Sequence, residues 1–69
     1  MKQRFRQGER VRWRSHGGYA EGEVLKRITS TTEAGGRTVR ASAEEPQYLV
    51  RSSKSGGEAV HKPDALEKI

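Results

Sequence analysis

The chain has 69 residues, which is enough for one small domain and excludes a second one. It contains no cysteine, so disulfide bonds and cysteine-rich zinc sites are excluded and the stability of the fold depends on packing. Fourteen lysines and arginines against nine acidic residues give a net charge of +5 and a pI near 10.1, which favours anionic partners such as nucleic acid.

Only 30% of the residues are hydrophobic, yet they fall in short runs bounded by Gly, Ser, Thr or Pro. This pattern indicates a folded, strand-rich domain rather than a disordered chain. The basic first six residues are followed by Gln7, Gly8 and Glu9, so we expect no signal peptide. No apolar run is long enough for a transmembrane helix, so we expect no membrane contact and a cytoplasmic location.

The first predicted strand covers residues 9–14, which alternate polar and apolar side chains with period two. Val11 and Trp13 are expected to face the core. The outward positions belong to three arginines, Arg10, Arg12 and Arg14. Residues 15–18 follow, and their Gly-Gly pair predicts a tight turn because glycine accepts the positive φ angles of a reversal.

The second predicted strand covers residues 19–29, and Gly22 near its start indicates a bend or bulge. Val24 and Ile28 share a parity and are expected to point inward. The alternation fails at Leu25 and Lys26. The sequence therefore leaves the register of this stretch open.

Residues 30–36 are polar and end in two glycines, which predicts a mobile hairpin loop. Alternation resumes over residues 37–43 and predicts a third strand, which Pro46 ends because proline has no N–H for the sheet ladder. Residues 47–52 form the fourth predicted strand, with Tyr48 among its inward residues.

A turn rich in Ser and Gly over residues 53–57 leads into a short fifth predicted strand over residues 58–62. Pro63 favours the start of a helical turn. Leu66 and Ile69 are three residues apart and would form one apolar stripe on that turn. We expect this C-terminal turn to cover an open end of the sheet.

Five short strands, tight glycine turns and a terminal helical turn predict an all-β fold, a small five-stranded SH3-like or Tudor-like barrel. The barrel would span residues 1–69 as a single, monomeric domain, with residues 1–7 as a flexible basic N-terminus. An OB-like barrel is disfavoured because it needs a helix between its third and fourth strands, where only residues 43–46 are available.

Several short motifs, by their order and spacing, resemble those of one protein family. They are residues 8–13 (GERVRW), 16–18 (HGG), 21–24 (EGEV), 46–50 (PQYLV) and 61–63 (HKP), followed by Leu66 and Ile69. Together they resemble the hypervirulence-associated Tudor-type domains, small bacterial and fungal domains of unknown function. The resemblance covers nearly the whole chain and implies an SH3-like or Tudor-like barrel without catalytic residues.

The arginines are the first candidate binding residues, because nine of the fourteen basic residues are arginine and arginine binds phosphate or carboxylate through paired hydrogen bonds. We expect a surface that binds nucleic acid or another acidic partner. Its candidate residues are Arg10, Arg12, Arg14, Arg27 and Arg40. The alternative interpretation is a solvated strand face whose charges keep other strands from pairing with it.

Aromatic side chains are the second group of candidates, because Tudor-type readers hold cationic side chains in a cage of rings. A peptide-binding adaptor is therefore the alternative function. Its candidate residues are Trp13, Tyr19, Tyr48 and Glu21. The period-two pattern places Trp13 and Tyr48 in the core, so Tyr19 is the best exposed candidate.

Catalytic and metal sites have little support in the sequence. Ser15, His16 and Asp64 contain the groups of a catalytic triad, but the motif that presents a nucleophilic serine is absent. His16 and His61 are far apart, and neither has a second ligand at metal-binding spacing. We therefore expect a non-enzymatic binding module without a metal or a cofactor.

Overall fold

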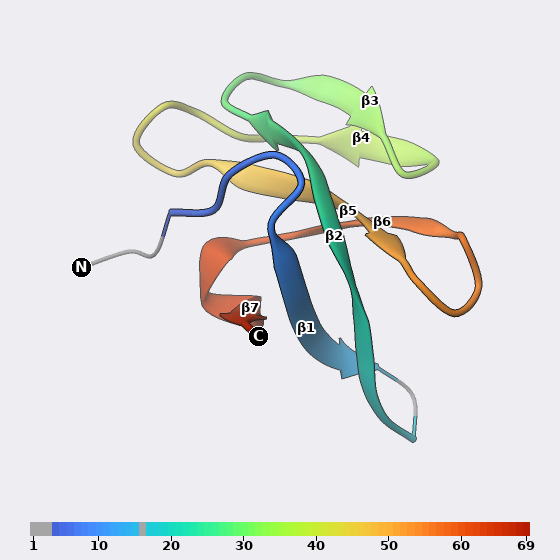
Figure 1. Cartoon of the computed structure of the whole chain (residues 1–69). Helices are drawn as coiled ribbons and strands as arrows, with labels where there is room; N and C mark the ends of the chain where they lie inside the picture. The colour runs from blue at the N-terminus through green and yellow to red at the C-terminus, as the bar shows by residue number, and fades with distance from the viewer. Residues whose placement is uncertain (1–3, 16) are drawn as a thin grey trace.

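The computed structural model describes residues 4–15 and 17–69, and these residues form seven β-strands and one short helical turn (Figure 1). The strands are β1 (Arg10–Ser15), β2 (Gly18–Ile28), β3 (Thr32–Ala34), β4 (Arg37–Val39), β5 (Gln47–Ser52), β6 (Glu58–His61) and β7 (Leu66–Lys68). The turn is a 3-10 helix, η1 (Pro63–Ala65). His16, which belongs to the predicted turn, lies outside the described residues, as do residues 1–3.

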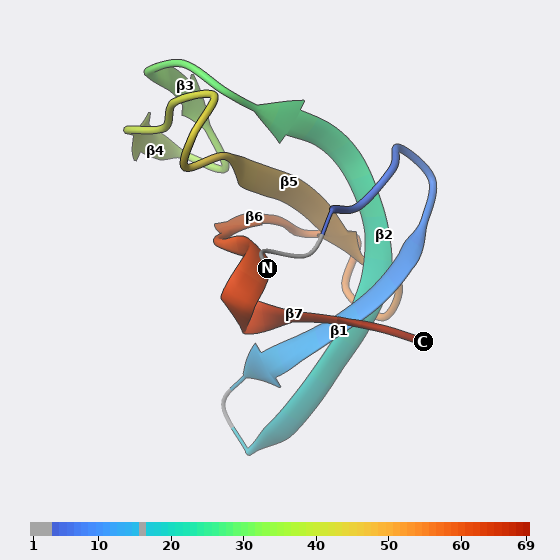
Figure 2. The ribbon, with the colours of Figure 1, turned by 90° about the vertical axis from the view of Figure 1, so that its left-hand side faces the viewer.

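Five of the strands form one antiparallel sheet in the order β6-β5-β2-β1-β7, and β3 pairs only with β4. The long strand β2 pairs with β1 over residues 18–23 and with β5 over residues 22–28. Figure 2 shows that β2 is strongly curved along this length. The sheet therefore wraps around its own inner face, where the larger part of the core lies.

The all-β prediction is confirmed, but the predicted closed barrel is wrong. Within the described residues β6 and β7 are the two edges of the sheet and do not pair with each other. Residues 37–43 are not a strand of this sheet, because the strand they begin ends at Val39 and belongs to the β3–β4 hairpin. The fifth position is taken instead by β7, which pairs with β1.

The β3–β4 hairpin replaces the mobile loop that we expected over residues 30–36. Thr32–Ala34 pair with Arg37–Val39, and the reversal is made by Gly35 and Gly36 with φ angles of 58° and 78°. Two consecutive positive φ angles are strained for residues with a side chain, so this turn requires its glycines.

The C-terminal prediction is correct for Leu66 and wrong for Ile69. One turn of 3-10 helix covers Pro63–Ala65, but the chain then extends into β7, so the C-terminal helical turn that would carry Leu66 and Ile69 is not confirmed. Leu66 is buried in the core, whereas Ile69 is 64% exposed. An extended chain turns successive side chains to opposite faces, so residues three apart do not form a common stripe.

A β-bulge interrupts the pairing of β2 with β5 between Val24 and Lys26. Val24 lies opposite Val50, whereas Ile28 lies opposite Gln47. One extra residue on a strand moves all later side chains to the other face of the sheet. Val24 and Ile28 are therefore both buried, but on opposite faces, which corrects the expectation that they point the same way.

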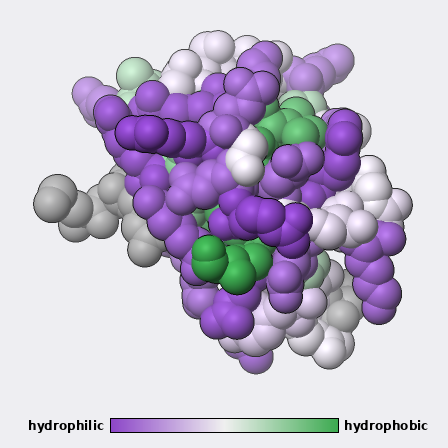
Figure 3. Space-filling model, in the orientation of Figure 1, coloured by the Kyte–Doolittle hydropathy of each residue, from purple (hydrophilic) through white to green (hydrophobic). Residues whose placement is uncertain are grey.

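Two clusters of apolar side chains result. The larger one fills the inner face and consists of Phe5, Val11, Trp13, Val24, Tyr48, Val50 and Leu66. The smaller one consists of Ile28, Val39 and Val60, with Ala34, Ala41 and Leu49 packed against it. The smaller cluster joins the β3–β4 hairpin to the opposite face of the sheet. The surface seen in Figure 3 is mostly hydrophilic with small, separate apolar patches.

Gly22 lies where β2 is paired with both β1 and β5, three residues before the bulge. A Cβ atom at this position would overlap the backbone carbonyl of Arg51 and would come within 2.9 Å of Cη2 of Trp13. The glycine therefore permits the close approach of the strands around the buried indole.

Residues 4–7, which we expected to be part of a flexible N-terminus, are anchored to the domain. The Phe5 ring is buried against Tyr48 with the two planes nearly perpendicular, and the Phe5 backbone N–H donates to the Tyr48 hydroxyl at 3.4 Å. Gly8 then donates its backbone N–H to the carbonyl of Val24 at 2.7 Å. These contacts hold the segment against the sheet.

Candidate functional site

The arginines of β1 face outward, as predicted, but two of them, Arg10 and Arg12, face carboxylates on the neighbouring strands. Arg12 lies between Glu67 on β7 and Glu21 on β2 in the strand register, and Arg10 lies opposite Glu23. The Nη2 atom of Arg10 is 3.9 Å from Oε1 of Glu21. Opposite charges on adjacent strands stabilise each other, so this face carries paired rather than excess charge.

The same alternation continues across the sheet. Glu23 lies opposite Arg51 on β5, and Arg51 lies opposite Glu58 on β6, with Nη2 of Arg51 3.9 Å from Oε2 of Glu58. We call this surface the charge ladder. It consists of Arg10, Arg12, Arg51, Glu21, Glu23, Glu58 and Glu67, and it contains more carboxylates than guanidinium groups.

Arg12 is the most firmly held member of the charge ladder. Its Nε and Nη2 atoms donate to Oε2 of Glu67 at 3.0 and 2.9 Å, and its guanidinium lies 4.9 Å from the centre of the Tyr19 ring. The hydrogen bonds to Glu67, and next the charge of that carboxylate, raise the pKa of Arg12 above its ordinary value. A ligand would have to compete with both neighbours for this guanidinium.

A second surface gathers cations around an open cleft of about 830 Å³. It is lined by residues 4–9, Arg27, Tyr48 and Lys68. Its charged side chains are Arg4, Arg6, Arg27, Lys68 and the single carboxylate Glu9. We call this surface the basic cleft. Four cations against one anion distinguish it from the charge ladder.

The N-terminal segment is held in the cleft by local hydrogen bonds. Oε1 of Glu9 accepts the backbone N–H of Arg6 at 2.9 Å, and the backbone N–H of Glu9 donates to the carbonyl of Arg6 at 3.0 Å. With Phe5 buried on one side and Gly8 bonded to β2 on the other, this turn fixes the backbone from which Arg4 and Arg6 project.

Arg27 reaches the cleft because of the bulge in β2. Period-two alternation without a bulge would place Arg27 on the face opposite to that of Val24 and Ile28. The extra residue instead brings Arg27 opposite Tyr48, a residue of the inner face that lines the same cleft. In the sequence, Gly22 indicated a bend or bulge in this strand, and the failed alternation at Leu25 and Lys26 marked where the shift occurs.

Glu9 neutralises one of the four cations. Its Oε2 atom lies 3.4 Å from Nζ of Lys68, which comes close because β7 pairs with β1. The backbone hydrogen bond from Arg6 is the largest cause that lowers the pKa of Glu9, and Lys68 lowers it further, so Glu9 is ionised at neutral pH. Within residues 4–15 and 17–69, the side chains of Arg4, Arg6 and Arg27 make no ion pair.

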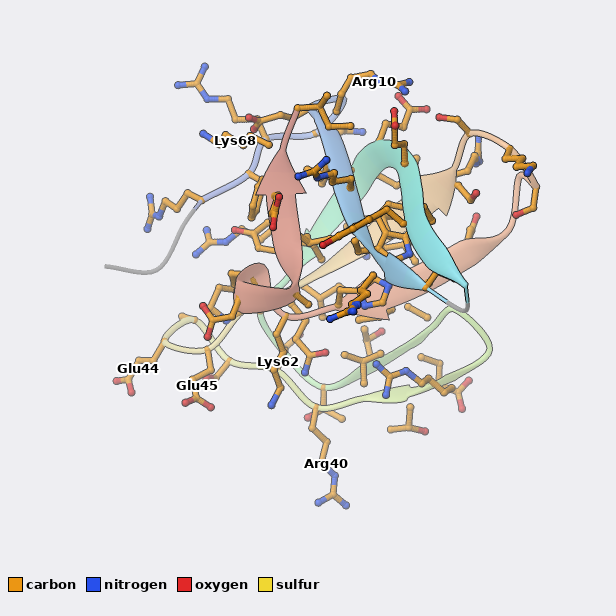
Figure 4. All side chains as sticks on the ribbon, turned by 90° about the horizontal axis from the view of Figure 1, so that it is seen from below. Arg10, Arg40, Glu44, Glu45, Lys62 and Lys68 are labelled. Carbon is orange, nitrogen blue, oxygen red and sulfur yellow. The ribbon has the colours of Figure 1, made fainter. Side chains whose placement is uncertain are left out.

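Arg40 and Arg14, the other two candidates, lie apart from this cleft. Arg40 lines a different cleft of about 560 Å³ together with Lys62, Glu45 and Asp64. In Figure 4 Arg40 and Lys62 project on the side of the molecule opposite to Arg10 and Lys68. Arg14, at the exposed end of β1, faces Tyr19. The five predicted arginines therefore do not form one surface.

The candidate residues for peptide binding also lie in different parts of the structure. Tyr48 is fully buried and Trp13 is 6% exposed, as their parity predicted, while Tyr19 is 61% exposed. Trp13 and Tyr19 share a small groove of about 300 Å³ with His61, Asp64 and Glu67. Tyr48 lines the basic cleft instead, and Glu21 lies near Arg10. The four candidates therefore do not assemble into one cage.

His61 forms the inner wall of this groove. Its ring lies 5.4 Å from that of Trp13, centre to centre, and its Nε2 atom is buried without a hydrogen-bond partner. Burial, followed by the nearby charge of Arg37, lowers the pKa of His61 below its ordinary value. The imidazole is therefore neutral at pH 7 and contributes packing rather than charge.

The described part of the chain holds no group of three or more His, Cys, Asp or Glu side chains that could bind a metal ion. None of its helical segments has the length and apolar character needed to cross a bilayer.

Comparison with known proteins gives one match. The sequence model of the family described as "Hypervirulence associated proteins TUDOR domain" matches residues 8–66, which is most of the chain. The search of curated proteins and the search of solved structures give no match.

Proposed function

The chain belongs to the family of Tudor domains of hypervirulence-associated proteins, and we propose that it is a binding module that holds the phosphate backbone of nucleic acid in the basic cleft. Tudor domains are non-catalytic binding modules. The observation that carries the proposal is the convergence of three guanidinium groups without ion-pair partners among the described residues, those of Arg4, Arg6 and Arg27, around one open cleft.

The distribution of charge along the chain supports this cleft over the charge ladder. Residues 1–14 contain six basic residues and one acidic residue, and residues 15–69 contain eight of each. The first fourteen residues therefore account for the whole net charge of +5. Arg10 and Arg12 face carboxylates of other strands, whereas Arg4 and Arg6 of the N-terminal segment make no ion pair among the described residues.

Arginine is suited to phosphate because its planar guanidinium donates two parallel hydrogen bonds to the oxygens of one phosphate. Arg4 and Arg6 project from a backbone fixed by Phe5 and Gly8, and Arg27 projects from a paired strand, so no backbone has to be ordered when a ligand arrives. Contacts of this kind position a nucleic acid without reading its bases.

The test is a titration of fluorescently labelled DNA and RNA, single- and double-stranded, with the full chain at low ionic strength, followed by added salt. Each phosphate contact on a duplex contributes about −0.9 to the slope of log K against log salt, so three arginines predict a slope near −3. Absence of binding at low salt, where counterion release favours the complex most, would contradict the proposal.

Two matched variants separate the cleft from the charge ladder. Arg27→Gln and Arg51→Gln each remove one positive charge, but Arg27 lines the cleft and Arg51 lies next to Glu58. We expect Arg27→Gln to weaken binding by about tenfold and to reduce the salt slope by about one. Arg51→Gln should leave the slope unchanged. Equal effects of the two variants would mean that only net charge matters.

An acidic protein is the other anionic partner that such a cleft could take. Poly-glutamate of matched length and charge serves as the probe. Nucleic acid should bind more tightly than poly-glutamate, because a phosphate in the backbone presents its oxygens closer to the chain than a flexible carboxylate side chain does. Equal or tighter binding of poly-glutamate would indicate that the partner is an acidic protein and not a nucleic acid.

The groove at Trp13 and Tyr19 supports a second candidate function, a peptide-binding adaptor. The supporting observation is that aromatic rings and the carboxylates of Asp64 and Glu67 line one groove, a combination that attracts cationic side chains. Arg12 already lies over Tyr19, so a peptide would have to displace it. Shifts of the Tyr19 NMR signals on adding a lysine-rich peptide, persisting at high salt, would support this function over the first.

A further inference from the structure

The basic cleft contains two aromatic rings, and neither offers a face to a ligand. Phe5 is 4% exposed and Tyr48 is fully buried. The two rings pack edge to face, with centres 5.3 Å apart and planes at 84°. The hydroxyl of Tyr48 accepts the Phe5 backbone N–H, so rotating the Tyr48 ring outward would break this hydrogen bond. Rotating the Phe5 ring outward would expose a buried side chain that anchors the N-terminal segment.

The remaining approach to Phe5 is occupied by a cation. Nζ of Lys68 lies 5.9 Å from the centre of the Phe5 ring and is held there by Glu9. The most exposed aromatic side chain of the described residues, Tyr19, lies in the groove beside Arg12 and does not line the cleft. A nucleotide held by Arg4, Arg6 and Arg27 therefore finds no ring on which its base could stack.

The absence of a stacking surface matters because proteins bind single-stranded and duplex nucleic acid by different means. Proteins that prefer single strands combine a basic groove with aromatic rings on which successive bases stack. A site made only of cations responds to the density of phosphates, which is higher along a duplex than along a single strand. The cleft has the cations and lacks the stacking surface.

The cleft also has little that would fix a side chain toward a base edge. Arginine is the commonest reader of guanine, through paired hydrogen bonds to its O6 and N7 atoms. Among the described residues, however, no side-chain hydrogen bond or ion pair holds the exposed guanidinium groups of Arg4, Arg6 and Arg27 in one orientation. Gln7 is the one exposed side chain lining the cleft that is polar and uncharged, since the hydroxyl-bearing Tyr48 is buried. It lies in the turn before Gly8 and is exposed. A single exposed amide supplies at most one such contact.

Resting on the proposed function, we infer that the ligand of the basic cleft is a nucleic-acid duplex, bound through its phosphates and without selection of sequence. The three free arginines bridge phosphates of the backbone, and the bases stay paired and stacked. The buried rings keep the cleft floor rigid and take no part in binding.

The experiment compares one short labelled duplex with each of its two separated strands, using the full chain across a salt titration. We expect the duplex to bind about fivefold more tightly at low salt and to show the steeper salt slope, since each contact contributes about −0.9 on a duplex and about −0.7 on a single strand. A duplex of A·T pairs and one of G·C pairs should differ by less than about twofold.

Binding of the single strands as tightly as the duplex, or a preference above about tenfold for one duplex sequence, would overturn the inference and leave the proposed function intact. Absence of binding to every nucleic acid would instead overturn the proposed function itself. The Gln7→Ala variant tests the one exposed amide of the cleft. The ratio of its affinities for A·T and G·C duplexes should equal that of the natural chain, and a changed ratio would show that Gln7 reads a base and would overturn the inference.

Discussion

The charge ladder and the basic cleft are both rich in arginine, yet they differ in what surrounds each guanidinium. On the ladder, every arginine faces a carboxylate across the strand pairing, and the net charge of the surface is not positive. In the cleft, one carboxylate is shared among four cations. The number of arginines in a stretch of sequence is therefore a poor guide to its electrostatic potential, which depends on the neighbours that folding supplies.

The two surfaces also differ in how their backbone is supported. The ladder lies on regular antiparallel strands, where alternation alone directs side chains outward. The cleft is made from a bulge, a glycine turn and a short segment held by one buried phenylalanine. Its geometry should consequently be more sensitive to single substitutions than that of the ladder.

The largest expected effect is that of Phe5→Ala. Removing a buried phenylalanine typically costs about 3–5 kcal/mol, and this one also anchors the segment that bears Arg4 and Arg6. We expect both the free energy of unfolding, measured with urea, and the affinity of the remaining folded chain for a duplex to fall. Trp13→Ala is the matched control.

Trp13 is buried in the same cluster but lies away from the cleft. Trp13→Ala should destabilise the fold by a similar amount, about 3–5 kcal/mol, while the folded fraction keeps its affinity. If Phe5→Ala left the affinity of the folded chain for duplex intact, the N-terminal segment would not support the cleft. A near-native stability of Trp13→Ala would place the indole outside the core.

The next largest effect is expected from charge reversal at the two surfaces. Arg27→Glu places a carboxylate in the cleft beside Glu9 and should lower the affinity for duplex by more than about tenfold. Arg51→Glu changes the net charge equally but acts on the ladder, next to Glu23 and Glu58. Arg51→Glu should weaken duplex binding only through long-range electrostatic repulsion of the phosphates. This repulsion is screened at high salt.

The ladder could be predicted from the sequence to the extent that it depends on local alternation. The period-two pattern correctly placed Val11 and Trp13 inside and the β1 arginines outside. It could not reveal the pairing of Arg12 with Glu67, because these residues are 55 positions apart and meet only when β7 joins β1. The predicted anion-binding role of Arg10, Arg12 and Arg14 stays a prediction.

The cleft was less accessible to sequence reasoning for a specific reason. A bulge moves every later side chain of its strand to the other face, and the sequence indicated it only through Gly22 and the failed alternation at Leu25 and Lys26, which left the register open. Arg27 was named as a candidate without its location, and Lys68 was missed. The buried Phe5 was missed as well, because a lone aromatic residue in a basic segment gives no periodic signal.

A smaller effect, opposite in sign, is expected at Glu9. Glu9→Gln keeps a side-chain oxygen that can accept the Arg6 backbone N–H but removes the charge that holds Lys68. The cleft would then have four uncompensated cations, so duplex affinity should rise by about threefold at low salt. The salt slope should steepen accordingly. Unchanged or weaker binding would indicate that Glu9 and Lys68 lie outside the contact with the ligand.

The smallest effect is that of pH, which should act on the fold and not on the cleft. The pKa of His61 is lowered in the folded chain, so the unfolded chain binds its proton more readily. The stability that neutral His61 contributes is therefore complete above the unfolded value of about 6.5 and is lost as the pH falls below it. Arginine stays charged over this pH range, so the affinity of the folded chain for duplex should not change with pH.

Urea unfolding at a series of pH values between about 8 and 5 measures this contribution. His61→Gln is the control, because it keeps every other titratable group and removes the imidazole that must desolvate. The difference in unfolding free energy between the natural chain and the variant should shrink as the pH falls. A difference that stays constant across the range would mean that His61 takes up its proton as easily in the folded chain as in the unfolded one.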